Sequence, residues 1–166
     1  VRDYFLFACF TGLSYADVKK FTRKEIEITD SGKWIKTRRK KTGGVVFVPI
    51  LDVAWQIIQK YNPYFEELMP EDPVLPIMSN QKMNGYLKEI ADLAKISKQL
   101  SYHIARHTFA TTVTMLNGVP IETVSKMLGH KNINSTQHYA RIVDQKVGED
   151  MELLSRRLGT RLALAN

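Results

Sequence analysis

Three short segments that read as β-strands constrain the fold of this chain more than any other feature. They run from Glu25 to Ile28, from Trp34 to Arg38 and from Val45 to Ile50. Polar and apolar residues alternate from Glu25 to Ile28, which is typical of a strand with one buried face. The turn signals Asp30-Ser31-Gly32 and Thr42-Gly43-Gly44 separate the segments, and connections this short join antiparallel neighbours. The pattern predicts a small antiparallel sheet of three strands.

The rest of the chain has the spacing and the end signals of helices. Ser14 is suited to cap a short helix, and Asn117-Gly118 is a typical left-handed helix end. We expect helices over residues 2–10, 15–18, 51–61, 81–96, 103–116, 120–129 and 134–139, and a helical tail at 149–164. The predicted fold is therefore mainly α with a small three-stranded antiparallel β-sheet, an α+β domain over residues 1–148 followed by a tail at 149–166.

The charge of the chain favours a polyanionic partner. The formal net charge is +7 over 166 residues, and such an excess attracts nucleic acid through electrostatics and counterion release. The positive charge is concentrated in one short stretch with six cations: Lys33, Lys36, Arg38, Arg39, Lys40 and Lys41. Because like charges repel one another, this cluster favours an anion bound among them; a solvated strand face is the alternative explanation.

Composition also excludes two classes of protein. Cys9 is the single cysteine, so an internal disulfide is impossible and a reducing, cytoplasmic compartment is favoured. No apolar run approaches the ~20 residues that a membrane-spanning helix needs, so we expect no membrane partner. The chain begins at Val1 rather than at Met, and we expect an N-terminal DNA-binding domain to precede it.

One face of the predicted helix at 103–116 carries an unusual set of side chains. Ala105, Phe109, Val113 and Leu116 form its apolar stripe, whereas a different face carries His103, Arg106, His107 and Ala110. A solvated face is one explanation. The other is a site for a phosphate, because arginine offers a planar fork of donors and histidine a titratable N–H.

Three further residues add candidate chemistry. His130 follows Gly129 at a helix C-terminus, where the helix dipole favours a protonated imidazole that donates to phosphate; a capping role is the alternative. Tyr139 lies on a short helix, and its phenoxide is able to attack phosphorus and form a covalent intermediate. Lys41, at a hairpin tip, is placed to protonate a leaving oxygen, with Lys36 and Lys40 as competitors.

Two other uses of these residues fit less well. His103 and His107 have the spacing of a zinc-protease pair, but Ile104 stands where that motif needs a glutamate, so we expect no metal. The helices at 103–116 and 120–128 have the outline of a helix-turn-helix. Such a motif needs no ordered set of two histidines, an arginine and a downstream tyrosine, and the set therefore favours an active site.

In order and spacing, these residues resemble the C-terminal catalytic domain of the tyrosine recombinase (phage integrase) family. The resemblance rests on His103-Ile104-Ala105-Arg106, on Leu128-Gly129-His130 and on Thr136-Gln137-His138-Tyr139. Lys41-Thr42-Gly43 resembles the hairpin lysine of the family, and Thr11-Gly12-Leu13 resembles the segment before its first arginine. The resemblance covers nearly the whole chain, and in this combination the motifs are highly specific.

The resemblance implies a metal-free and ATP-independent reaction on double-stranded DNA. Arg106 and His103 would contact the non-bridging oxygens of the scissile phosphate, and His130 would add a hydrogen bond. Tyr139 would form a 3′-phosphotyrosine and free a 5′-hydroxyl, with Lys41 as the general acid. No cofactor is implied. Family members work as four protomers on two duplexes, and the tail at 149–166 is a candidate for docking on a neighbour. Lys36, Arg38, Arg39, Lys40 and His107 are expected to contact DNA.

The sequence departs from the family pattern at one position. Ser14 stands where the family has its first catalytic arginine, and a hydroxyl cannot replace a bidentate, charged donor. We hypothesise that Arg2 substitutes for it, with Arg38 or Arg39 as rivals. Serine at this point, followed by Tyr15-Ala16-Asp17-Val18, also resembles the integrases of Bacteroidetes conjugative transposons.

The expected function is therefore site-specific DNA recombination at the nucleoid by a mobile-element integrase or a related recombinase. A DNA-binding module that has lost turnover with its first arginine is one alternative. A DNA-relaxing topoisomerase with the same chemistry is another.

Overall fold

A computed structural model confirms a mainly helical chain with one small sheet. It describes residues 1–140, 148, 151–152 and 154–156. The strands are β1 (Ile26–Thr29), β2 (Gly32–Arg38) and β3 (Val45–Pro49). The helices are α1 (Arg2–Thr11), α2 (Tyr15–Lys19), α3 (Asp52–Tyr61), α4 (Asn80–Leu93), α5 (Tyr102–Thr108), α6 (Ile121–Met127) and α7 (Asn134–Ala140). Most predicted elements are confirmed to within a few residues, including the Ser14 cap of α2.

The three strands form an antiparallel sheet in the order β1-β2-β3. Ile35 in the central strand pairs with Ile26 on one side and Val48 on the other, and all three are buried. The opposite face carries Trp34 and Phe47, whose rings stack with centroids 4.5 Å apart. One face of the sheet therefore closes the core, and the other faces outward.

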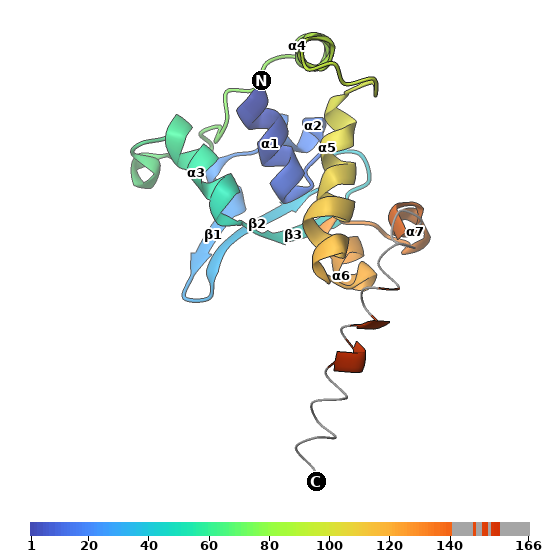
Figure 1. Cartoon of the computed structure of the whole chain (residues 1–166). Helices are drawn as coiled ribbons and strands as arrows, with labels where there is room; N and C mark the ends of the chain where they lie inside the picture. The colour runs from blue at the N-terminus through green and yellow to red at the C-terminus, as the bar shows by residue number, and fades with distance from the viewer. Residues whose placement is uncertain (141–147, 149–150, 153, 157–166) are drawn as a thin grey trace.

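Helix α1 forms the centre of the core. It lies between α3 and α5 (Figure 1), and it contacts both of them. Phe7 and Ala8 are completely buried, and Cys9 is nearly so. Burial raises the pKa of the Cys9 thiol to about 11, so this cysteine is inert core packing. Gly12, with a φ of 69°, ends the helix in the left-handed conformation that glycine tolerates.

The segment predicted as one helix over 103–116 is broken into three parts. After α5 the chain makes a π-helical turn over Phe109–Thr114 and a 3₁₀ turn over Met115–Asn117. The Thr114 hydroxyl donates to the carbonyls of Phe109 and Ala110, and threonine side chains that bond the backbone in this way distort regular helices. The predicted apolar stripe holds at Phe109, but it is wrong at Leu116, which is 43% exposed.

Helix α4 buries a different face from the one that its apolar spacing suggests. Met83, Leu87 and Ala91 are buried, at intervals of four residues. Tyr86, Ile90 and Leu93, whose helical spacing in the sequence predicts the apolar face of this helix, are exposed instead. The helix also ends at Leu93 rather than at residue 96, because Lys95 adopts a positive φ of 54° that an α-helix excludes.

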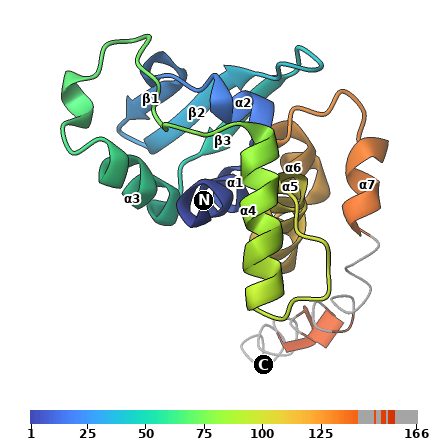
Figure 2. The ribbon, with the colours of Figure 1, turned by 90° about the horizontal axis from the view of Figure 1, so that it is seen from above.

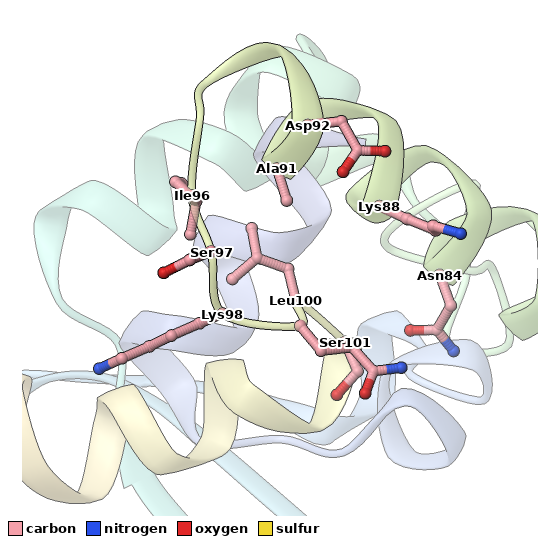
Figure 3. Close-up of a pocket in the computed structure, with 10 residues that line it drawn as sticks. Asn84, Lys88, Ala91, Asp92, Ile96, Ser97, Lys98, Leu100 and Ser101 are labelled. Carbon is pink, nitrogen blue, oxygen red and sulfur yellow. The ribbon is translucent and has the colours of Figure 1, made fainter.

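A cavity of about 450 Å³ lies between α4 and the segment that leads to α5. Ala91 and Leu100 face one another across it (Figure 3). None of the residues predicted to act in chemistry lines this cavity, so it is separate from the site described below.

Helices α6 and α7 pack side by side at the far end of the domain from α3, as Figure 2 shows. The tail predicted at 149–164 lies mostly outside the described residues, of which 151–152 and 154–156 are helical. No helix in the described ranges is both long enough and apolar enough to cross a membrane.

Candidate active site

Arg106 lies at the centre of the candidate site and is 3% exposed. Its Nη1 donates to the carbonyl of Gly12 at 2.6 Å, and its Nη2 donates to the carbonyl of Leu128 at 2.5 Å. Burial, followed by the charge of Arg39, lowers the pKa of Arg106 to about 10, so the guanidinium remains charged at neutral pH. The fixed, desolvated cation joins α1, α5 and the turn that follows α6.

Arg39 lies next to Arg106 rather than on the outer face of the hairpin. Its Nη1 donates to the carbonyl of Leu128 at 3.0 Å, the same oxygen that Arg106 uses. Its Nε lies 2.8 Å from Oδ2 of Asp17, and the Arg39 side chain is 11% exposed. This contact is an ion pair without a hydrogen bond, because the Nε–H bond of Arg39 does not point at the Asp17 oxygen. The structure therefore places a second guanidinium beside the first.

Asp17 is a residue that sequence reasoning missed. Its carboxylate is buried, and it accepts from the Ser14 hydroxyl at 2.7 Å and from the backbone N–H of Lys40 at 2.9 Å, besides pairing with Arg39. In the sequence, an acidic residue in the first turn of a short helix indicates only capping. Its contacts with the hairpin span more than twenty positions and leave no local signal.

Ser14 and Arg2 are placed differently from Arg39. The Ser14 hydroxyl donates to Asp17, so this donor is already occupied. Arg2 is the first residue of α1, its side chain is 79% exposed, and it pairs with Asp3. Gly12, whose carbonyl holds Arg106, lies at the other end of α1, about 15 Å away along a ten-residue helix. The structure therefore separates Arg2 from the other site residues.

His130 is held between Arg106 and α7. Its Nε2 lies 3.1 Å from Nη2 of Arg106, and its Nδ1 lies 2.8 Å from the Thr136 hydroxyl. Burial and the charges of Arg106 and Arg39 lower the pKa of His130 to about 4. This direction differs from the sequence-based expectation of a protonated imidazole, because burial and two neighbouring cations, which the sequence does not reveal, both favour the neutral ring. A neutral ring that accepts at Nε2 carries its proton on Nδ1 and donates it to Thr136.

Tyr139 is buried, with 6% exposure, rather than displayed on the surface. Its ring meets the His107 ring edge-on at a centroid distance of 4.7 Å. It also lies nearly parallel to the His130 ring, with ring centroids 6.4 Å apart. The hydroxyl also interacts with Arg106. Helix α7 thus brings the predicted nucleophile to the predicted phosphate ligands.

The remaining predicted residues lie around this centre. His103 contacts His107, with ring centroids 5.1 Å apart. Burial, followed by the charges of Arg106, Arg39 and Lys41, lowers the pKa of His103. Lys41 is exposed at the hairpin tip, as are its neighbours Arg38 and Lys40. Lys36, by contrast, pairs with Glu27 on the outer face of the sheet. In the described ranges, no group of three or more His, Cys, Asp or Glu side chains has the arrangement of a metal site.

The structure therefore gathers, in one mainly helical domain, the arginine, histidines and tyrosine on which the resemblance to the tyrosine recombinase (phage integrase) family rests. A family comparison agrees, since the profile of the phage integrase family matches residues 2–146. This match covers most of the chain, and the chain belongs to the phage integrase family.

Individual relatives are similar over part of their length. The chain is 29% identical over 134 residues to the tyrosine recombinase XerA of Saccharolobus solfataricus, and the aligned region covers 80% of this chain and 43% of that protein. It is 31% identical over 106 residues to a tyrosine recombinase of Thermosipho africanus, and here the aligned region covers 60% of this chain and 35% of that protein. The chain therefore spans less than half the length of these relatives.

Solved structures show the same fold. The crystal structure of XerA recombinase matches with a TM-score of 0.68 and 19% identity, over 92% of this chain and 61% of that one. The Tn1549 transposon integrase in complex with transposon right end DNA matches with a TM-score of 0.63 and 17% identity, over 82% and 53%. Membership of the Bacteroidetes subgroup stays a prediction.

Proposed function

We propose that this chain is the catalytic domain of a site-specific recombinase that cleaves and rejoins DNA through a 3′-phosphotyrosine at Tyr139. The observation that carries the proposal is the position of Tyr139, buried beside Arg106 and next to the rings of His107 and His130. A phenol held next to a buried guanidinium is suited to attack a phosphate that the guanidinium binds.

The proposed step keeps atoms and charges in balance. The Tyr139 oxygen forms a bond to phosphorus while the bond from phosphorus to the 5′ oxygen breaks. The phenolic proton passes to water or to a neutral imidazole, and Lys41 delivers a proton to the leaving oxygen. Arg106, His103 and His130 bind the phosphate oxygens. The phosphotyrosine retains the energy of the bond, so attack by a 5′-hydroxyl rejoins DNA without ATP, metal or cofactor.

Arg39 supplies the guanidinium that Ser14 does not. It shares the Leu128 carbonyl with Arg106 and is held by Asp17, the residue that also binds the Ser14 hydroxyl. A second cation, 11% exposed, is therefore provided beside the first from the loop that follows β2 rather than from the segment after α1. This assignment replaces Arg2, which is exposed at the opposite end of α1.

We expect Arg39→Ala to slow cleavage by about 10²–10³-fold, the usual effect of removing one donor that stabilises a transition state. Arg2→Glu should leave the rate unchanged. Because the Ser14 hydroxyl already lies 2.7 Å from Asp17, an arginine introduced there reaches the same carboxylate, and Ser14→Arg should restore part of the rate to Arg39→Ala. Single-turnover cleavage measures these effects. A rate that falls with Arg2→Glu and not with Arg39→Ala would reverse the assignment.

Thr136 orients His130, and its removal provides a second test. Thr136 is completely buried, and its hydroxyl meets Nδ1 of His130. Thr136→Val keeps the shape but leaves the Nδ1 proton without an acceptor, a loss of about 1–3 kcal/mol. We expect cleavage to slow by roughly 5- to 150-fold, the rate equivalent of this loss. Thr136→Ser keeps the hydroxyl and should retain most activity, so equal rates in the two variants would rule out this role.

Double-stranded DNA is the proposed substrate, bound through the exposed cations of the β2–β3 hairpin. Arg38, Lys40 and Lys41 are exposed there, and the chain has a net charge of +7. The matched Tn1549 integrase and lambda integrase structures are described as complexes with DNA, the latter as a dimer. We propose that this protein also self-associates on DNA, as a tetramer in which the tail at 149–166 docks on a neighbour, and that it acts at the nucleoid.

Incubation of the full-length protein with a nicked DNA site tests the proposal. A covalent adduct at a 3′ phosphate that forms in EDTA and without ATP is the expected result. DNA binding with no adduct would instead indicate an inactive binding module. Relaxation of supercoiled DNA that carries no second site, with no strand exchange between two sites, would indicate a topoisomerase.

A further inference from the structure

Two glycines from distant parts of the chain bring two backbone segments into direct contact. Gly44 lies at the end of the β2–β3 hairpin loop, and Gly129 lies between Leu128 and His130. A Cβ added to Gly44 would lie 2.5 Å from the carbonyl oxygen of Gly129. A Cβ added to Gly129 would lie 3.0 Å from the carbonyl oxygen of Val45. Backbone atoms limit both approaches, so no side-chain rotation relieves them.

The same contact fixes the loop that carries Lys41. The Gly44 carbonyl accepts from the backbone N–H of Arg39 at 2.8 Å, and the Gly43 N–H donates to the Arg39 carbonyl at 2.9 Å. These bonds close the loop over residues 39–44. Arg39 also donates to the Leu128 carbonyl. Both ends of the loop are therefore seated on the backbone of residues 128 and 129, immediately before His130.

Gly44 is required for space rather than for its backbone conformation. It is absent from the glycines with positive φ, whereas Gly43 has a φ of 68°. An alanine at position 44 is therefore free of intrinsic backbone strain, and its only conflict is with Gly129. The neighbouring Gly43 has nothing within 4 Å of an added Cβ. Within this loop, Gly44 is therefore required because a side chain there would collide with Gly129, whereas Gly43 is required because its φ is positive.

We propose that Gly44 is a positioning residue, which seats the loop 39–44 against Gly129 and so places the Lys41 ammonium at the leaving 5′ oxygen. This inference rests on the function proposed above. A misplacement of about 1 Å costs on the order of 10²-fold in rate, and a methyl group 2.5 Å from a carbonyl oxygen forces a displacement of this kind.

The test compares two substrates that differ only in the leaving atom. In one, the scissile phosphate has its ordinary 5′ oxygen, and in the other a 5′-bridging sulfur. A thiol has a pKa near ~8.5 and leaves as a thiolate without a proton, so the sulfur substrate needs no general acid. On ordinary DNA, Gly44→Ala and Lys41→Ala should both lose about 10²-fold in single-turnover cleavage. On the sulfur substrate, both should be within a few-fold of wild type.

Gly43→Asn is the matched control, because asparagine tolerates positive φ and nothing crowds this position. It should cleave both substrates at the wild-type rate. Insertion of one glycine after Thr42 displaces Lys41 without adding a Cβ at the contact, and it should show the same selective loss as Gly44→Ala. This second variant keeps the test decisive if Gly44→Ala does not fold.

Three results would overturn the inference. These are wild-type cleavage of ordinary DNA by Gly44→Ala, wild-type cleavage by the insertion variant, and a loss in folded Gly44→Ala that the sulfur substrate does not relieve. The last result would mean that Gly44 acts on the phosphate ligands or on Tyr139 rather than on Lys41. Absence of an adduct from the wild type on both substrates would instead contradict the proposed recombinase chemistry.

Discussion

Tyr139→Phe should abolish the covalent protein–DNA adduct completely while leaving DNA affinity within a few-fold of wild type. The substitution removes one oxygen atom and keeps the ring that lies next to those of His107 and His130. The fold should therefore survive, and only the nucleophile is lost. Gel analysis of adducts on nicked DNA, together with an equilibrium binding titration of the same samples, measures both quantities.

Tyr15→Phe is the matched control for this loss. Tyr15 is also partly buried and donates its hydroxyl to the carbonyl of Met78, but it lies on α2 and is given no chemical role. This variant should form the adduct at close to the wild-type rate. If Tyr139→Phe still formed an adduct, or if Tyr15→Phe abolished it, the nucleophile would be misassigned.

Arg106→Ala should reduce the rate of cleavage by at least about 10²–10³-fold, since it removes a charged donor to the phosphate. It should also destabilise the fold. The Gly12 carbonyl, which Arg106 binds at 2.6 Å, would lose this donor, whereas the Leu128 carbonyl keeps Arg39. Leaving one buried acceptor unsatisfied costs about 1–3 kcal/mol. Single-turnover kinetics and urea unfolding measure the two effects separately.

Arg106→Lys should not restore the rate, because an ammonium lacks the planar fork that binds Gly12, Leu128 and a phosphate oxygen together. An exposed arginine provides the comparison. Arg38→Ala removes a cation of the hairpin surface, so it should weaken DNA binding in a salt-dependent manner and leave the rate of the bound complex nearly unchanged. Wild-type cleavage by Arg106→Ala would contradict the site described here.

The parts of the fold that the sequence predicts best are those encoded locally. The sheet follows from three strand-like segments separated by two glycine turns, and Gly118 ends its helical segment in the left-handed conformation. The motif order also predicts which side chains meet, since Arg106, His130 and Tyr139 are gathered together. These features are encoded by the spacing of residues that lie close together in the sequence, or by a motif order that as a whole resembles that of the family.

The parts that the sequence does not predict are long-range polar contacts. Nothing near Asp17 in sequence indicates that it binds Arg39 and the Lys40 backbone. The low pKa of His130 likewise follows from burial beside Arg106 and Arg39, which lie far away along the chain. The position of Arg2 is a further example, because its place in the sequence does not indicate that it lies exposed at the end of α1 opposite to Gly12.

Apolar spacing alone also misled at α4. Both of its faces carry apolar residues, and the chain buries Met83, Leu87 and Ala91 while Tyr86 and Leu93 stay exposed. Periodicity identifies a helix, but the elements packed against it decide which of two similar faces is buried.

The most direct test of the account is to map the residue that becomes attached to DNA. The full-length protein is trapped on a nicked site in EDTA, the adduct is digested with nuclease and protease, and the modified peptide is sequenced by mass spectrometry. The expected result is a 3′-phosphate ester on the Tyr139 oxygen. An adduct on any other residue, or one that forms only when a divalent metal is present, would contradict it.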